Sequence, residues 1–177
     1  MHGLPPIGAE IPCSMLAINS TIEYQGTTIA CDFRGGVKHR VDVNPDDPIT
    51  SVRLRTVGFK VSAETDKGTI TIEQNDIDVD PKSLLKVTQN FPPKLHHHDV
   101  QDFTITFDFR KDDAGNKRGE PVVLTTKQSM VCEANLTQFP PRGDLYKLAR
   151  SVEFVDPEEP DKVIARMTAF DSKRGGL

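Results

Sequence analysis

Residues 103–109 read Phe-Thr-Ile-Thr-Phe-Asp-Phe, and this stretch decides the fold class. Every odd-numbered side chain in it is apolar and every even-numbered one is polar. Because successive side chains of a β-strand point to opposite faces, this period of two predicts a strand with one buried face. Apolar residues at helical spacing are not persuasive here or anywhere else in the chain.

The same alternation continues on both sides of this strand. Short groups of Gly, Pro, Asn and Asp separate the alternating runs, and Gly35-Gly36 is typical of a hairpin turn. The runs cover residues 16–24, 27–33, 37–43, 52–61, 69–74, 122–132, 146–154 and 163–170. We therefore expect an all-β fold, a single antiparallel β-sandwich or β-barrel domain of about nine or ten strands with little helix.

The outline of this domain also follows from the pattern. Residues 1–12 are expected to be an extended N-terminal segment, residues 13–170 the single β domain, and residues 171–177 a disordered tail. Within 52–61 the apolar residues change from even to odd numbers beside Gly58. One extra residue in a strand inverts which side chains face inward, so a β-bulge is predicted there.

Composition narrows the classes of function. The formal net charge of −4 argues against nucleic acid as a partner, since phosphates require a basic face. No stretch of about 18 apolar residues is present, so we expect no membrane span. The N-terminus lacks the basic and apolar runs of a signal peptide, and the three cysteines have no CxxC spacing. A cytoplasmic protein with reduced thiols is the simplest interpretation.

A short sequence occurs twice. Thr-Gln-Asn-Phe91-Pro-Pro-Lys resembles Thr-Gln-Phe139-Pro-Pro-Arg, and each copy leads from one strand toward another. The copies could be two rigid linkers that agree by chance. Alternatively, both loops lie at the same end of the sheet and together frame a mouth.

The most conspicuous polar cluster is His96-His97-His98-Asp99. In an extended chain His96 and His98 project to one side, and His97 and Asp99 to the other. A His-x-His pair on a strand can offer two imidazoles to a divalent transition metal, with His39 or Asp32 as a third ligand from another strand. The alternative is a run of surface histidines at the start of a strand.

Several polar residues occupy positions that strand parity assigns to the interior. They are His39, Gln128, Tyr146 and Arg150. A buried polar group is costly unless it is paired or lines a wet pocket, and an apolar cavity with a few directed polar groups is typical of a small-molecule site. There Arg150 would hold a carboxylate or enolate oxygen, Gln128 or Tyr146 would donate a hydrogen bond, and His39 would move a proton.

Three functions remain open. The first is a β-barrel or sandwich that binds an apolar small molecule, polyketide-like or terpenoid-like, and acts as a cyclase or isomerase without a cofactor. The second is a structural or protein-interaction β module, in which a homo-oligomer is one arrangement. The third is a metal-dependent enzyme built on the His96–Asp99 cluster. No P-loop, Gly-x-Ser-x-Gly or His-Glu-x-x-His motif decides whether the chain is an enzyme.

Overall fold

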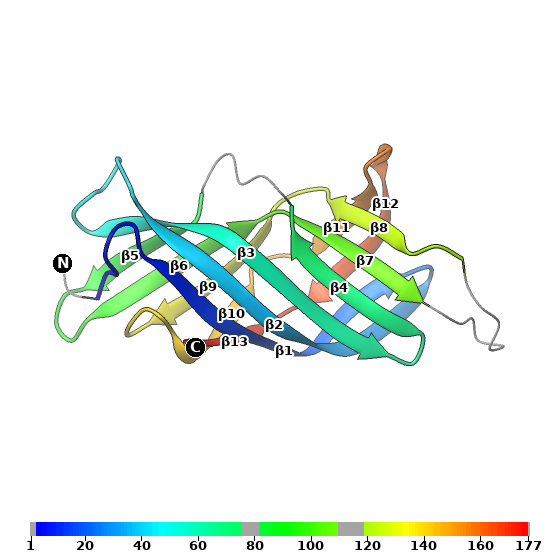
Figure 1. Ribbon diagram of the computed structural model, residues 1–177, viewed down its shortest axis with the longest axis horizontal. Coiled ribbons are helices and arrows are strands. Elements are labelled where there is room, and N and C mark those ends of the chain that lie inside the picture. The colour runs from blue at the N-terminus through cyan, green and yellow to red at the C-terminus, as the bar shows by residue number, and fades with distance from the viewer. Residues whose placement is uncertain (1–2, 76–81, 110–118, 177) are drawn as a thin grey trace.

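The computed structural model describes residues 3–75, 82–109 and 119–176, and these ranges form one antiparallel sheet (Figure 1). The all-β prediction is confirmed, with thirteen strands rather than nine or ten. No helix long and apolar enough to cross a membrane occurs in these ranges. The strands are β1 Glu10–Tyr24, β2 Thr27–Val43, β3 Ser51–Thr65, β4 Gly68–Gln74, β5 Leu84–Gln89, β6 Lys94–Gln101, β7 Phe103–Phe109, β8 Val122–Thr126, β9 Met130–Leu136, β10 Arg142–Leu148, β11 Val152–Asp156, β12 Glu159–Ala169 and β13 Ser172–Gly176.

The sheet closes on itself twice. Its order is β12-β11-β8-β7-β4-β3-β2-β1-β13-β10-β9-β6-β5, and two further pairings join β12 to β1 and β3 to β5. The first closure makes a ring of β1–β4, β7, β8, β11 and β12, which we call the aromatic barrel. The second makes a ring of β1–β3, β5, β6, β9, β10 and β13, which we call the polar barrel. Full closure removes the exposed strand edges that an open sheet would present.

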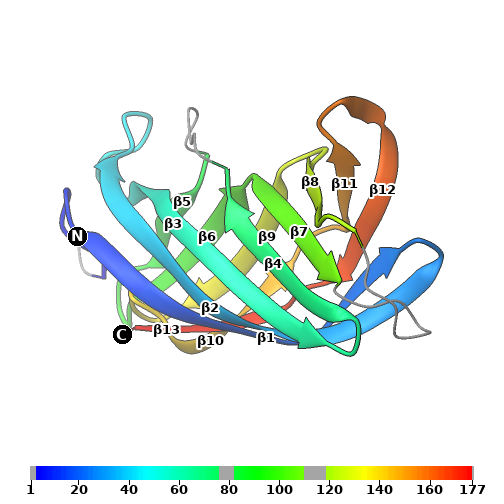
Figure 2. The ribbon, with the colours of Figure 1, turned by 45° about the vertical axis from the view of Figure 1, so that its right-hand side comes forward.

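Strands β1, β2 and β3 belong to both rings and run the length of the molecule (Figure 2). The first half of β1 pairs with β13 through residues 13–16, and its second half pairs with β12 through residues 21–24. Likewise β3 pairs with β5 near its start and with β4 near its end. The three long strands therefore form a wall that continues from one barrel into the other.

The predicted bulge beside Gly58 is confirmed. Lys38 pairs with Gly58 whereas the next residue, His39, pairs with Thr56, so Val57 is the extra residue of β3. Its side chain is 39% exposed, while Thr56 and Phe59 on either side are buried. Thr56 continues the inward parity of Val52 and Leu54 and lies next to His39, and the extra residue moves the inward positions to odd numbers from Phe59 onward.

Gly35-Gly36 is not a hairpin turn, because β2 continues through it from Thr27 to Val43. A Cβ atom on Gly35 would lie 2.0 Å from the carbonyl oxygen of Lys60 on the neighbouring β3. Glycine is thus needed here for the close approach of two backbones, and not for a turn.

The chain repeatedly leaves one barrel for the other. It passes from β6 to β7 at Asp102, from β8 to β9 at residues 127–129, from β10 to β11 at residues 149–151 and from β12 to β13 at residues 170–171. The single strands expected over 122–132 and 146–154 are therefore wrong, since each is two strands in different barrels. The side chains that face inward in one strand therefore do not predict which side chains face inward in the strand after the link.

The expected disordered tail is also wrong for residues 171–176; residue 177 and residues 1–2 lie outside the described ranges. Ser172–Gly176 forms β13, which pairs with β1 on one side and β10 on the other. The segment has no large apolar residue, so its composition does not reveal a buried strand. The two backbone ladders and the buried side chain of Arg174 hold it in place.

The two interiors differ in chemistry. In the aromatic barrel, Tyr24 stacks on Phe107 with ring centroids 4.1 Å apart, and the Phe59 and Phe103 centroids are 4.6 Å apart. Such aromatic pairs add packing energy beyond the area they bury. The polar barrel instead encloses most of the buried charged and hydrogen-bonding side chains described below.

Candidate functional site

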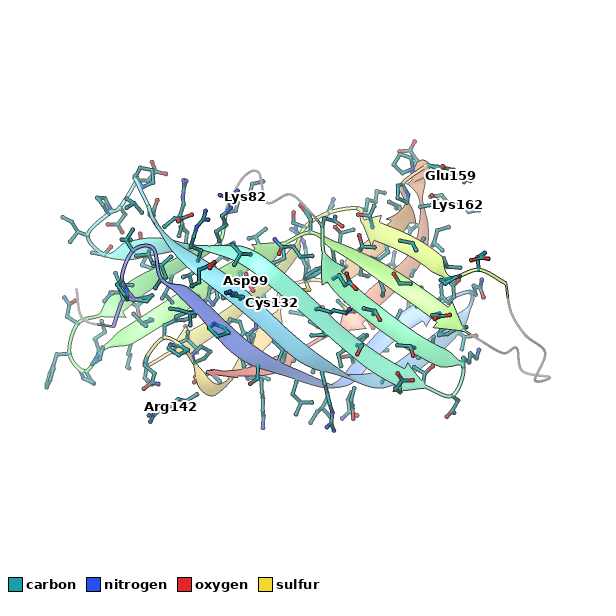
Figure 3. The ribbon with its side chains drawn as sticks, in the orientation of Figure 1. Lys82, Asp99, Cys132, Arg142, Glu159 and Lys162 are labelled. Atoms are coloured by element: carbon teal, nitrogen blue, oxygen red, sulfur yellow. The ribbon has the colours of Figure 1, made fainter. Side chains whose placement is uncertain are left out.

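The candidate site is a buried polar cluster inside the polar barrel, made of His39, His97, Asp99, Tyr146 and Arg174. Four strands supply them, namely β2, β6, β10 and β13, and each side chain is at most 1% exposed. In Figure 3 Asp99 and Cys132, which pair across β6 and β9, lie inside the molecule, whereas the labelled Arg142 and Lys162 lie at its periphery.

An ion pair is at the centre of the cluster. Arg174 Nη1 donates to Asp99 Oδ2 at 2.7 Å, and Gln101 Nε2 donates to the same oxygen at 2.8 Å. Burial by itself would raise the pKa of Asp99, but Arg174, the two histidines and the hydrogen bond from Gln101 together outweigh it and hold the pKa well below the usual range. The guanidinium of Arg174 also lies 4.0 Å from the ring centroid of Tyr146, a cation–π contact.

The two histidines are neutral at pH 7. Burial lowers the pKa of His39 to about 4 and the pKa of His97 well below its ordinary value. Burial also raises the pKa of the Tyr146 phenol, which therefore keeps its proton. We assign that proton as donated to Nδ1 of His97, 2.5 Å away, so the Nε2 atom of His97 carries the ring hydrogen. His39 Nδ1 lies 3.3 Å from the hydroxyl of Thr56, the last inward residue of β3 before the bulge.

Several buried polar atoms in the cluster and beside it have no hydrogen-bond partner among the described residues. They are His97 Nε2, Arg174 Nε and Nη2, Gln101 Oε1 and Ser172 Oγ. A buried polar atom left without a partner costs about 1–3 kcal/mol. The first three of these atoms are hydrogen-bond donors, so the cluster can receive an electron-rich oxygen atom. The negative charge of Asp99 and the positive charge of Arg174 offset each other.

The cluster also contains a set of metal ligands. One ligand atom each from His39, His97 and Asp99 lie within 4.8 Å of one another. Two imidazoles and a carboxylate are the ligand set of many zinc and non-haem iron sites. Both oxygens of Asp99 already accept hydrogen bonds, however, and the nearby guanidinium would repel a cation.

The predicted parity of the histidine run is confirmed. His97 and Asp99 are fully buried, whereas His96 and His98 are half-buried on the outer face of β6. There His98 Nδ1 lies 2.8 Å from Glu133 Oε1, and His96 Nε2 lies 3.5 Å from the same oxygen. His39, suggested as their third ligand, is on the opposite, inner face.

Asp32, the other suggested third ligand, does not join that pair either. It accepts a hydrogen bond from the backbone N–H of Asn19, in the part of β2 that lines the aromatic barrel. Metal binding by His96 and His98 therefore stays a prediction, without the third ligand that was expected for it.

The structure brings together two of the four polar residues that the sequence selected, His39 and Tyr146, which both contact His97. It places Gln128 and Arg150 on the surface, in the links between barrels, and Arg150 donates to the carbonyl oxygen of Ser129. These two inward assignments are wrong because each rested on a strand that ends before the residue.

Other residues provide the buried amide and guanidinium that were expected from Gln128 and Arg150. Gln101 and Arg174 supply the buried amide and guanidinium. Gln101 continues the parity of His97 and Asp99, so the pattern of β6 contained a signal for it. Arg174 alternates with Lys173 in a segment without apolar neighbours, so the sequence carried almost no signal for its burial.

Comparisons with known proteins identify the fold alone. No protein-family model matches the chain, and no curated protein sequence matches it. Among solved structures, the chain is similar to DynF from the dynemicin biosynthesis pathway of Micromonospora chersina. The TM-score is 0.69 at 16% sequence identity, over 99% of this chain and 83% of DynF.

Proposed function

We propose that this chain binds an apolar small molecule inside the polar barrel and holds it by an oxygen atom at the buried polar cluster. The observation that carries the proposal is the set of donors on His97 and Arg174 that are buried and have no hydrogen-bond partner among the described residues. Around them the barrel wall is apolar, with Val41, Leu85 and Leu95 all fully buried. Apolar walls with a few convergent polar groups are the usual composition of a small-molecule site.

The finer proposal is a cyclase or isomerase that needs no cofactor and acts on a polyketide-like or terpenoid-like molecule. His39, neutral at pH 7, would take a proton from a carbon beside a carbonyl group. The electron pair then moves to the carbonyl oxygen, where Arg174 and the N–H of His97 would stabilise the enolate. Return of the proton to another carbon leaves an isomer, so no oxidant or reductant is consumed.

Two further observations support this proposal. Burial disfavours protonated His39, so the imidazolium would return its proton readily, as an isomerisation requires. DynF, which shares the fold, comes from a biosynthesis pathway, and this favours biosynthetic chemistry over a purely structural role. A cytoplasmic location stays a prediction.

Native mass spectrometry of the untagged chain, purified without added metal or chelator, tests the binding. We expect a mass excess of a few hundred daltons that denaturation releases, and its loss in Arg174→Met. Arg150→Met is the matched control, because it removes an exposed arginine and should keep the excess. If Arg174→Met does not fold, Tyr146→Phe replaces it as the test. This variant deletes only one hydroxyl and should weaken retention of the bound molecule.

A clean mass for the wild-type chain that also stays unchanged after incubation with cell extract would contradict binding. The released molecule, added back to the protein, should be converted to a product of equal mass, and recovery of the unchanged molecule would contradict the cyclase or isomerase proposal. A clean mass together with oligomer peaks would favour the interaction module.

The second candidate function is metal-dependent catalysis, favoured by the convergence of His39, His97 and Asp99. A mass excess of one transition-metal ion per chain, lost in His97→Ala, would support this inner site. Loss in His96→Ala instead would support the outer pair with His98.

A further inference from the structure

We infer that the small molecule enters the polar barrel at the end formed by the two Phe-Pro-Pro turns, and that Phe139 closes this entrance over the two buried histidines. The inference rests on the proposed function, since an entrance has meaning only if the barrel takes up a molecule. Beyond the proposed function, the inference names the path by which the molecule enters and the residue, Phe139, that controls entry.

Strand pairing places both turns at one end. Leu95 at the start of β6 pairs with Leu136 at the end of β9, and Lys94 pairs with Gln89 at the end of β5. The turn 90–93 and the turn 137–141 are therefore neighbours, at the left-hand end of Figure 1. The link 44–50 between β2 and β3 lies at the same end, because Ser51 pairs with Lys86 near the end of β5.

Along β6, His97 lies nearer this end than Asp99 does. His97 is the next inward residue after Leu95 along β6, and Asp99 lies deeper. Phe139, from the second turn, has its ring centroid 5.8 Å from that of His97 and 6.1 Å from that of His39. These distances are those of ring-to-ring contact, so Phe139 covers both imidazoles from the side of the turns.

The N-terminal segment, residues 3–9, completes the cover. Its Gly8 N–H donates to the Val41 carbonyl at 2.8 Å, and the Val41 N–H donates to the Ala9 carbonyl at 2.9 Å. At the other side, Gly3 packs against the side chain of the inward-facing Leu95. The segment thus reaches from β2 to β6 across the end of the barrel, with few hydrogen bonds to break compared with a strand ladder.

Three exposed apolar side chains also belong to the segments at this end. The three most exposed large apolar side chains of the described residues are Phe91 at 91%, Ile49 at 70% and Ile7 at 55%. They come from the first Phe-Pro-Pro turn, the 44–50 link and the N-terminal segment, all at this end. At an entrance, these exposed side chains would offer an apolar molecule its first contact.

The two turns supply a matched pair of variants. Phe139→Ala removes the ring that covers the histidines, and Phe91→Ala removes the exposed ring of the equivalent turn. Stopped-flow fluorescence with cis-parinaric acid, an apolar polyene with a carboxylate, measures association and dissociation rates. We expect Phe139→Ala to raise both rates by about tenfold with little change in affinity, because a gate alters the barrier and not the bound state. Phe91→Ala should keep the wild-type dissociation rate.

The outcomes separate the two proposals. Wild-type rates in Phe139→Ala, with the probe still bound, would overturn the entrance and leave the proposed function standing. Equal acceleration in both variants would also overturn the role of Phe139. Absence of probe binding in the wild-type chain would overturn both. Phe139→Leu, which keeps apolar volume but removes the ring, should show a smaller acceleration and replaces Phe139→Ala if that variant does not fold.

Discussion

At the scale of single residues, the stability of the polar barrel depends on one buried ion pair. Asp99 and Arg174 are 0% and 1% exposed, so neither charge can be hydrated if the other is removed. Removing one partner of a buried pair is far more costly than removing both. This asymmetry distinguishes a buried pair from the exposed pairs elsewhere on the molecule.

Asp99→Asn should therefore lower the free energy of unfolding by about 3–5 kcal/mol. The double variant Asp99→Leu with Arg174→Met should be less destabilised than either single variant, as urea unfolding would measure. Glu153→Gln, which breaks the exposed pair with Arg166, is the control and should change the free energy of unfolding far less, because solvent screens exposed pairs. Additive effects of the two buried substitutions would contradict the ion pair.

The buried histidines make stability depend on pH. Unfolded histidine takes up a proton below about pH 6.5, whereas folded His39 does so only near its lowered pKa of about 4. The unfolded state binds more protons between these values, so stability should fall as the pH falls from 6.5 to 4. Each histidine contributes at most about 1.4 kcal/mol per pH unit.

Urea midpoints measured between pH 4.5 and 7 test how steeply stability depends on pH. His39→Met should make this dependence shallower. Val41→Ala, which shortens a neighbouring inward side chain without removing a titratable group, should lower the midpoint at every pH but keep the slope. An unchanged slope in His39→Met would contradict the neutral, buried state of His39.

At the scale of elements, β1, β2 and β3 join the two barrels, and at Gly35 the backbones of β2 and β3 approach each other closely. A Cβ at Gly35 would overlap the carbonyl oxygen of Lys60, a backbone atom that cannot move without breaking the β2–β3 ladder. By contrast, a Cβ at Gly58, within the same pair of strands, would meet its nearest neighbour at 3.7 Å.

Gly35→Ala should therefore cost at least about 2 kcal/mol of unfolding free energy, and Gly58→Ala less than about 1 kcal/mol. Thermal and urea unfolding of the two variants give the comparison. Similar stability of both variants would mean that β2 and β3 are not as close at Gly35 as the structure shows.

At the scale of the whole molecule, two barrels that share three strands should unfold together. Neither ring is complete without β1, β2 and β3, so loss of one barrel leaves the other open. The chain contains two tyrosines and no tryptophan, and each tyrosine reports on one barrel: Tyr24 stacks on Phe107 in the aromatic barrel, and Tyr146 lies in the polar barrel.

Tyrosine fluorescence of Tyr24→Phe and of Tyr146→Phe thus follows each barrel alone. We expect the fluorescence midpoint of each variant to coincide with its own midpoint by far-ultraviolet circular dichroism in urea, as two-state unfolding requires. A fluorescence transition that precedes the loss of sheet in either variant would show that the barrels unfold independently.

The sequence by itself determined the features that depend on neighbouring residues. Alternation identified the fold class, the change of phase beside Gly58 located the bulge, and parity separated His97 and Asp99 from His96 and His98. Each follows from the backbone geometry of one strand, in which side chains alternate regardless of what lies opposite.

Only the tertiary structure decided which strands meet, where the sheet closes and which inward polar groups come together. The ion pair joins residues 75 positions apart, Asp99 on β6 and Arg174 on β13. The two closures likewise depend on the registers of β1 with β12 and of β3 with β5. Gln128 and Arg150 were predicted in the site but lie outside it, whereas Arg174 lies in it without having been predicted. The reason is that the alternation within one strand does not encode how that strand pairs with distant strands.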